Sequence, residues 1–210
     1  MRMDRHVKAF TLVELMVGLM VTSIILAAVA TLAFALSTGA TAGSDYAYTQ
    51  AQIRRATVYV SDLIARCSLI CAAPGYDLAI WRSDDNNNGR INLNELVYLE
   101  RGADRQYLRL CGFESTSNPE IALADLASPT AKGQFITAYG AHYTPLIPDC
   151  SDAQFSFLGV PPPRTAVLGI TFEFAEDRTM HQYEIVAAAR CLAVHRLNAA
   201  GDAIVATDDD

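Results

Sequence analysis

The chain lacks charge over a long stretch near its N-terminus. No residue from Leu15 to Leu36 is charged, and the first charge after Glu14 is Asp45. About 20 apolar residues are enough to cross a bilayer as a helix. The stretch is therefore a candidate membrane span.

Basic residues are also scarce, because 16 Lys and Arg stand against 23 Asp and Glu, which gives a formal net charge of −7. The leader Met1–Ala9 has a net charge of +2, so the rest of the chain carries −9. This acidity argues against nonspecific nucleic-acid binding, since phosphate contacts require Lys and Arg. Positive charge before a first apolar segment keeps that end cytoplasmic. The sequence thus predicts a single-pass inner-membrane protein whose domain lies outside the cytoplasm.

Catalytic signatures are missing as well. The chain has no serine-centred elbow, phosphate-binding loop or dinucleotide fingerprint. His142, His181 and His195 are scattered and share no metal-ligand spacing with carboxylates. We therefore expect no enzyme activity, and a membrane-anchored exported enzyme is the least favoured function.

Five cysteines suit an exported domain, where an oxidising environment allows up to two disulfides with one thiol left over. They are Cys67, Cys71, Cys111, Cys150 and Cys191. The sequence does not decide their connectivity. Cys67 and Cys71 are also spaced as half of a metal site, but no second Cys or His pair has matching spacing.

Glu14 is unusual, because a membrane helix normally excludes an unpaired carboxylate. The segment AFTLVELMVGLMV (9–21) resembles the leader-and-helix motif shared by type IV pilins and type II secretion pseudopilins. The resemblance implies that a prepilin peptidase cleaves between Ala9 and Phe10, and that the new Phe10 amine is methylated. The family usually has Gly before the cleaved bond, whereas this chain has Ala9.

The resemblance also gives Glu14 a role in assembly. Its carboxylate is expected to pair with the N-terminal amine of a neighbouring subunit and to set the axial register of a filament. A carboxylate in an apolar layer is tolerable when a cation pairs with it. Two alternatives for the apolar stretch remain open, namely a secretory signal cleaved beyond Leu36 and a plain membrane anchor.

The chain is expected to have an α+β, pilin-like fold, with a long N-terminal helix packed on an antiparallel sheet. Apolar residues at spacings of three and four form one helical stripe, at Ile53, Thr57, Val60, Ile64 and Cys67. A Gly-, Ser- and Thr-rich segment, Ser37–Ser44, favours a kink or a melted turn. The predicted segments are a leader (1–9), a membrane or filament-core helix (10–36), the rest of the helix (37–71), a β-rich domain (72–200) and an acidic tail (201–210).

Alternation predicts the strands of the domain. They are Leu78–Trp81, Glu95–Arg101, Arg105–Phe113, Phe155–Leu158, Val167–Phe174 and His181–Arg190. Short turns between successive strands imply antiparallel pairing. Four prolines interrupt the segment from Glu114 to Asp152, which we expect to be an irregular insertion with a short helix ending near Leu126.

The segment DDNNNGRINLNE (84–95) resembles an EF-hand loop. The first, third, fifth, seventh, ninth and twelfth positions of that pattern are filled by Asp84, Asn86, Asn88, Arg90 (through its carbonyl), Asn92 and Glu95, with Gly89 at the sharp turn. Oxygen ligands at these offsets suit calcium. The flanks are predicted to be strands, so the loop would sit in a β-hairpin. An Asn- and Gly-rich turn that binds nothing is the alternative.

These features favour a minor pilin or minor pseudopilin, a structural subunit that primes or caps a type IV filament or a type II secretion pseudopilus. Its partners would be other pilin or pseudopilin subunits and the prepilin peptidase. The alternative is a membrane-anchored exported adhesion module with a calcium-stabilised domain, whose ligand contacts the insertion 114–152.

Overall fold

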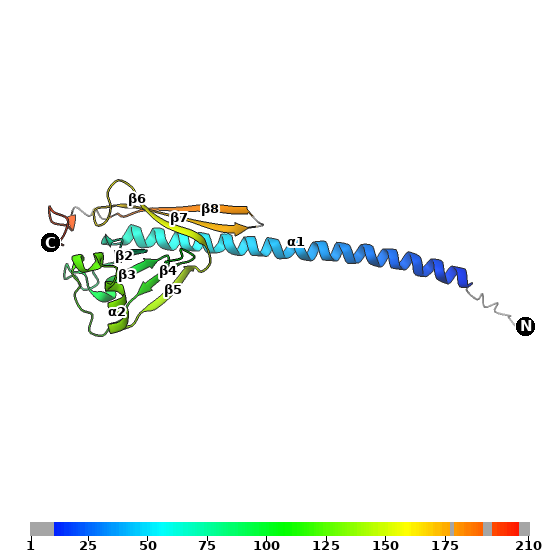
Figure 1. The fold of residues 1–210 in the computed structure, drawn as a ribbon, viewed down its shortest axis with the longest axis horizontal. Helices are drawn as coiled ribbons and strands as arrows, with labels where there is room; N and C mark the ends of the chain where they lie inside the picture. The colour runs from blue at the N-terminus through cyan, green and yellow to red at the C-terminus, as the bar shows by residue number, and fades with distance from the viewer. Residues whose placement is uncertain (1–10, 177–178, 191–194, 206–210) are drawn as a thin grey trace, which may run out of the picture. The chain divides into compact units, whose positions relative to one another are not determined.

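The computed structural model describes residues 11–176, 179–190 and 195–205. The chain divides into two compact units, Met1–Thr49 and Gln50–Asp210. Its fold is α+β, as predicted, because helix α1 (Leu12–Arg66) precedes two antiparallel sheets (Figure 1). The boundary between the units falls inside the predicted helical segment 37–71.

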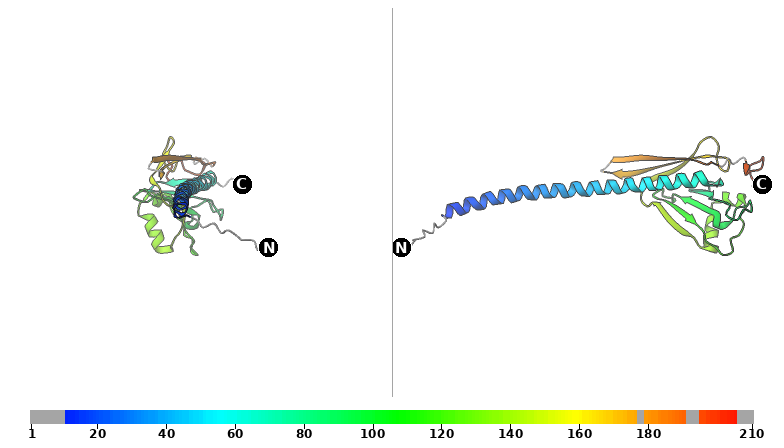
Figure 2. Two further views of the ribbon diagram at one scale, coloured as in Figure 1. Left: turned by 90° about the vertical axis from the view of Figure 1, so that its right-hand side faces the viewer. Right: turned by 180° about the vertical axis from the view of Figure 1, so that it is seen from behind.

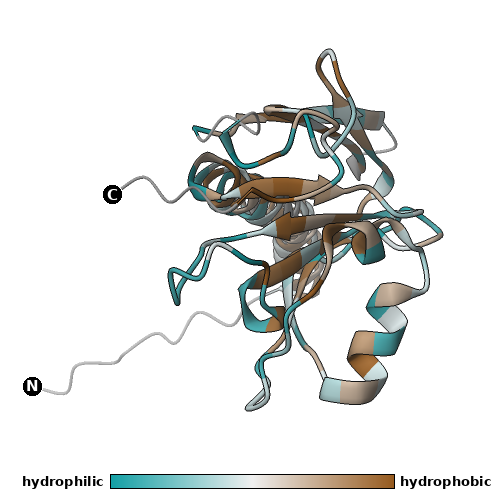
Figure 3. Cartoon of the chain, turned by 90° about the vertical axis from the view of Figure 1, so that its left-hand side faces the viewer, coloured by the Kyte–Doolittle hydropathy of each residue, from teal (hydrophilic) through white to brown (hydrophobic). Residues whose placement is uncertain are grey.

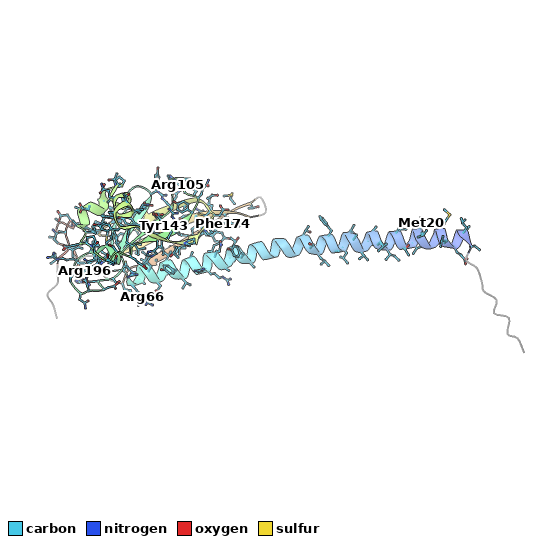
Figure 4. The ribbon with its side chains drawn as sticks, turned by 90° about the horizontal axis from the view of Figure 1, so that it is seen from below. Met20, Arg66, Arg105, Tyr143, Phe174 and Arg196 are labelled. Carbon is cyan, nitrogen blue, oxygen red and sulfur yellow. The ribbon has the colours of Figure 1, made fainter. Side chains whose placement is uncertain are left out.

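In the first unit, α1 is long and apolar enough from Leu12 to Thr38 to cross a membrane. None of this span is buried, and its large apolar side chains, Met20 among them, project outward (Figure 4). The predicted melted turn at Ser37–Ser44 is wrong, because helical backbone continues through it. Its two glycines cost about 2 kcal/mol relative to alanine, which a long cooperative helix can absorb.

In the second unit, the predicted stripe of α1 faces the core, with Ile53, Val60 and Ile64 buried. Arg54, Arg55 and Asp62 are exposed, as expected. The helix ends at Arg66 rather than near Cys71, because residues 69–72 form a strand that pairs with Asp77–Trp81. The Ser68 N–H already donates to the Trp81 carbonyl at 2.9 Å, so pairing with the sheet replaces the next helical turn.

The predicted single sheet is in fact two sheets. The five-stranded sheet has sequential order and contains β1 (Leu69–Ala72), β2 (Asp77–Trp81), β3 (Leu96–Glu100), β4 (Leu108–Gly112) and β5 (His142–Ile147). The three-stranded sheet contains β6 (Ser151–Phe157), β7 (Val167–Glu176) and β8 (Thr179–Ala188). Within the second unit, the sheets lie on opposite sides of α1 (Figure 2).

Two apolar clusters result. The first joins α1 to both sheets, and it includes Leu108 and Leu110 on the face of β4 predicted to be apolar. The second lies on the opposite face of the five-stranded sheet, around Trp81 and Tyr98. Figure 3 shows apolar residues gathered in the central strands and hydrophilic residues in the surrounding loops. The five-stranded sheet is therefore covered on both faces.

The insertion supplies the cover for the second cluster. It holds the 3-10 turn η2 (Leu123–Ala127) in place of the expected short helix, and then helix α2 (Ala131–Tyr139), which the sequence did not predict. Leu123 and Leu126 are buried in the cluster, and Phe135 and Ile136 pack against it. The insertion is therefore part of the folded domain rather than a separate binding loop.

Candidate functional site

Glu14 lies in the first turn of α1, where its carboxylate is hydrogen-bonded to Thr11. Glu14 Oε2 accepts hydrogen bonds from the Thr11 N–H and the Thr11 hydroxyl, both at 3.0 Å. In return, the Glu14 N–H donates to Thr11 Oγ1 at 3.2 Å. This reciprocal arrangement is a capping box, which satisfies backbone groups at the start of a helix. The sequence analysis did not identify Thr11. The predicted processing residues, Ala9 and Phe10, lie outside the described residues.

The loop between β2 and β3 is flanked by strands, as predicted, and it ends in a 3-10 turn, η1 (Leu93–Glu95). Asp84 holds the turn at its start, because its two carboxylate oxygens accept the Asn88 N–H at 3.1 Å and the Gly89 N–H at 2.9 Å. Gly89 has φ +69°. Glycine is favoured at this left-handed position because it has no Cβ.

Three asparagine side chains meet inside this loop. The amide nitrogens of Asn86 and Asn88 donate to Asn92 Oδ1 at 3.0 and 2.9 Å. Four of the six predicted ligands, Asp84, Asn86, Asn88 and Asn92, are therefore joined by hydrogen bonds. An asparagine amide rotated by 180° presents its oxygen in place of its nitrogen. These side chains are thus able to offer oxygen atoms to one cation.

Glu95, the predicted bidentate ligand, has a different environment. It is only 2% exposed, and its carboxylate accepts three N–H groups. Oε2 accepts the Trp81 indole N–H at 3.1 Å and the Asn92 N–H at 3.2 Å, and Oε1 accepts the Asp85 N–H at 3.0 Å. The carboxylate therefore anchors the loop to the core in this arrangement. A cation that used it would compete with these donors.

The remaining predicted ligand, Arg90, would contribute its carbonyl. Its side chain points to the insertion, where Nη1 lies 2.7 Å from Glu120 Oε2. Backbone hydrogen bonds from Ile121 to Ile91 and from Leu93 to Pro119 join the loop to the same segment. The loop is thus held by β2 and β3 at its ends and by the insertion along its length. A bound ion would therefore have to order fewer loop residues.

The donor set limits the kind of ion that this loop can hold. Among the described residues, no three His, Cys, Asp or Glu side chains converge as a metal site. The loop brings two carboxylates together with amide and carbonyl oxygens. Such a set suits a hard cation such as calcium, held weakly because few ligands are charged. The residue types therefore fit calcium, although each side-chain oxygen of the set already accepts hydrogen bonds within the loop, and Glu95 alone accepts three N–H groups.

The cysteines form no reactive site in the described part of the chain. No disulfide joins any two of Cys67, Cys71, Cys111 and Cys150, and Cys191 lies outside the described residues. Cys71 and Cys111 belong to β1 and β4, three strand spacings apart, which is too far for a disulfide. Burial raises the pKa of the Cys111 and Cys150 thiols to about 11, so neither is an activated thiolate.

Comparison with known proteins concerns the N-terminal region. Residues 4–30 match the family model described as the prokaryotic N-terminal methylation motif. The match includes the predicted cleavage point, Glu14 and more than half of the apolar span. Neither the curated proteins nor the solved structures contain a match to this chain. The N-terminal motif predicted from the sequence is therefore confirmed.

Proposed function

We propose that this chain, whose prokaryotic N-terminal methylation motif extends into an exposed apolar helix, is a minor pilin or minor pseudopilin. In this role it is anchored in the inner membrane, cleaved by a prepilin peptidase and assembled with other subunits into a filament. The observation that carries the proposal is the apolar span of α1, which the motif overlaps and no part of which is buried among the described residues. An apolar surface of this size requires lipid or neighbouring helices.

The test is mass spectrometry of the N-terminus after co-expression with a prepilin peptidase. We expect a peptide that begins at N-methyl-Phe10. An intact leader in the natural sequence, together with cleavage of an Ala9→Gly variant, would identify Ala9 as a poor cleavage residue. An intact leader in both proteins would favour the plain membrane anchor over the filament subunit. Cleavage beyond Leu36 would contradict the filament role.

The adhesion alternative places ligand contacts in the insertion 114–152. The buried side chains of this insertion contribute to the second apolar cluster. Deletion of the whole insertion would therefore unfold the domain and would not separate binding from assembly. Substitutions of exposed residues on α2, such as Gln134 and Thr137, are the appropriate test of binding.

We also propose that the loop 84–95 binds calcium and stabilises the domain. The side chains of Asn86, Asn88 and Asn92, which are hydrogen-bonded to one another, and the Asp84 carboxylate, which accepts the Asn88 N–H, support this proposal. With few charged ligands, we expect a Kd of about 10⁻⁴–10⁻³ M, as in extracellular modules. At 10 mM calcium this affinity corresponds to about 1.4–2.7 kcal/mol of stabilisation. The melting temperature should rise by roughly 3–10 °C.

The sole tryptophan provides a second readout of calcium binding, because Trp81 donates its indole N–H to Glu95. Its fluorescence should change on titration if calcium recruits the Glu95 carboxylate. Asp84→Ala should abolish the melting shift, whereas the matched variant Asp85→Ala should retain it, since Asp85 binds Ser83 and Arg82 instead. Equal shifts in both variants would refute the calcium site. Glu95→Ala is not a suitable test. It removes a buried carboxylate that accepts three N–H groups, so it would destabilise the domain whether or not calcium binds.

A further inference from the structure

We propose that the free edge of β8 is a docking site for an extended strand of a different protein chain. Among the described residues, β8 pairs only with β7, through ten consecutive residue pairs without a register shift. An antiparallel strand turns half of its N–H and C=O groups toward each side. The outer side of β8 therefore presents a regular row of backbone groups that another strand can pair with.

The other sheet edges are each protected. β1 has only four residues and a register shift. β5 contains Pro145, whose nitrogen has no hydrogen to donate. β6 is bulged between Ser151 and Gln154. The N–H and C=O of Ala153 are already bonded to the Arg105 carbonyl and the Arg101 guanidinium.

Among the described residues, β8 is neither short, nor bulged, nor interrupted by proline. Its sequence, TMHQYEIVAA, also lacks lysine, which natural proteins use to block an edge, and Glu184 is its only acidic residue. Two of its apolar side chains point outward, with Met180 51% exposed and Val186 62% exposed. A long, regular and partly apolar edge invites strand pairing. Among the described residues, β8 is the one sheet edge that is both long and free of a register shift, which favours a role in strand pairing.

A second copy of this chain is a poor occupant of the edge. The protected edges β1, β5 and β6 offer no complementary strand to β8. Antiparallel pairing of β8 with β8 of a second copy would place residues 50–66 of the two α1 helices in opposite directions, and parallel pairing gives the less stable ladder. β8 runs in the same direction as α1, because Tyr183 contacts Gln50 and Arg190 contacts Ala65. This step rests on the proposed function, since the subunits of one filament share one orientation.

The exposed face of β8 indicates the chemistry of the partner. Met180, Gln182, Glu184 and Val186 alternate along it. Glu173 on β7 pairs with Gln182, so it lies diagonally across from Glu184 and makes this face negative. A strand added to the edge is best matched by a basic residue beside Glu184 and apolar residues beside Met180 and Val186. The inferred partner is therefore an extended segment with a basic residue between apolar ones.

Hydrogen exchange on the full-length protein in detergent tests the inference. The probe is a synthetic peptide with the sequence of Val167–Glu176, the strand that already pairs with β8, carrying Gly169→Val, Thr171→Lys and Glu173→Lys, so that in the register of β7 a lysine lies beside Glu184 and apolar residues lie beside Val186 and Met180. We expect at least a tenfold slowing of exchange at β8 amides when the peptide saturates the edge. A control peptide with the same side chains but alternate backbone nitrogens methylated should give no protection, because it lacks donors on the pairing side.

Charge reversal at an exposed position tests the chemistry of the partner. Glu184→Arg should weaken binding of the lysine peptide by about threefold, the change expected when a like-charge cross-strand pair replaces an opposite-charge pair. The same variant should bind the unmodified sequence, which keeps Glu173, more tightly. Glu184 is exposed, so the fold should be unchanged.

Three results would overturn the inference. They are unchanged exchange at β8, equal protection by the methylated peptide, or concentration-dependent self-association that protects β8 without peptide. The last result would assign the edge to a second copy. None of these measurements depends on cleavage at Ala9, so failure of the docking site and failure of the filament role are distinguishable.

Discussion

Replacing Lys132 with methionine is expected to lower the free energy of unfolding of the domain by about 3 kcal/mol. Lys132 lies on α2, and its ammonium contacts two carboxylates of the five-stranded sheet, Asp77 and Glu100. Glu100 is 1% exposed, so it depends on these partners for charge compensation. Removal of one partner from a buried ion pair leaves an uncompensated charge, and this is more costly than the pair is stabilising.

The magnitude follows from the surroundings of the pair. Lys132 Nζ lies 2.7 Å from Glu100 Oε1, and Arg109 contacts the other carboxylate oxygen of Glu100. Arg109 is itself held over the rings of Tyr107 and Tyr143, so it stays in place when Lys132 is lost. Lys132 is also 21% exposed. The expected loss therefore lies at the lower end of the range of about 3–5 kcal/mol for such changes.

The titration of Lys132 agrees with this role. Burial disfavours its charged form, but the hydrogen bonds and charges of Asp77 and Glu100 outweigh burial and raise the pKa of its ammonium. A group whose pKa is raised on folding stabilises the folded state below its unfolded pKa and loses this contribution at higher pH. The contribution of Lys132 is therefore fully present at neutral pH, where the unfolding measurement is made.

Urea unfolding of the full-length protein in detergent measures the change, with the fluorescence of buried Trp81 as the signal. The matched control is Arg66→Met, which breaks the exposed pair between Arg66 and Asp62 and should cost less than about 0.5 kcal/mol. Adding Glu100→Gln to Lys132→Met should recover part of the loss, because the uncompensated carboxylate is removed. If Lys132→Met lowers the free energy of unfolding no more than Arg66→Met does, the charge of Glu100 is compensated by water and not by Lys132.

The fold was predictable where one local pattern decided it. The face of β7 that holds Leu168, Ile170 and Phe172 is buried as predicted, because alternation leaves only one apolar side. The short turn then pairs β7 with β8 in register. The stripe of α1 was likewise predictable from its helical spacing, since both patterns involve residues close in sequence.

Features that depend on distant contacts were not predictable. Residues 69–72 continue the apolar character of α1, and only pairing with β2 makes them a strand. Helix α2 has a glycine, Gly133, and little apolar patterning, and Lys132 and Phe135 fix it through contacts with the sheet. The division into two sheets depends on α1 lying between them. No pattern within a single segment of the sequence predicts this arrangement.

The candidate cation loop also combines features that local spacing predicts with features that depend on distant contacts. The spacing of Asp84, Asn86, Asn88 and Asn92 predicted that they share one curled loop around an ion, and in the structure hydrogen bonds join these four residues. The same spacing assigned Glu95 to the ion, but the structure gives its carboxylate to the Trp81 indole. Trp81 precedes the loop, and its indole reaches Glu95 only because β2 and β3 pair at Trp81 and Leu96.

Replacing Glu14 with glutamine is expected to reduce incorporation into filaments at least tenfold, if the chain assembles as proposed. The carboxylate would lie in an apolar layer beside the N-terminal amine of a neighbouring subunit. Loss of its charge leaves that ammonium buried without a partner, which costs about 3–5 kcal/mol. The measurement is the amount of the chain in sheared filaments relative to the membrane fraction, at equal total expression.

The capping box at the start of α1 makes a second explanation testable. Glu14 Oε2 accepts hydrogen bonds from Thr11, so a weaker helix start is a second explanation, beside the missing charge, for any loss of assembly in a Glu14 variant. Glutamine retains an oxygen that accepts from Thr11, whereas Thr11→Ala removes the hydroxyl and keeps the Glu14 charge, at a cost of about 0.5–2 kcal/mol to the cap. If charge pairing drives assembly, Glu14→Gln fails to incorporate and Thr11→Ala retains most incorporation. The reverse order would assign Glu14 to capping, and its position in the motif would then reflect helix initiation rather than axial register.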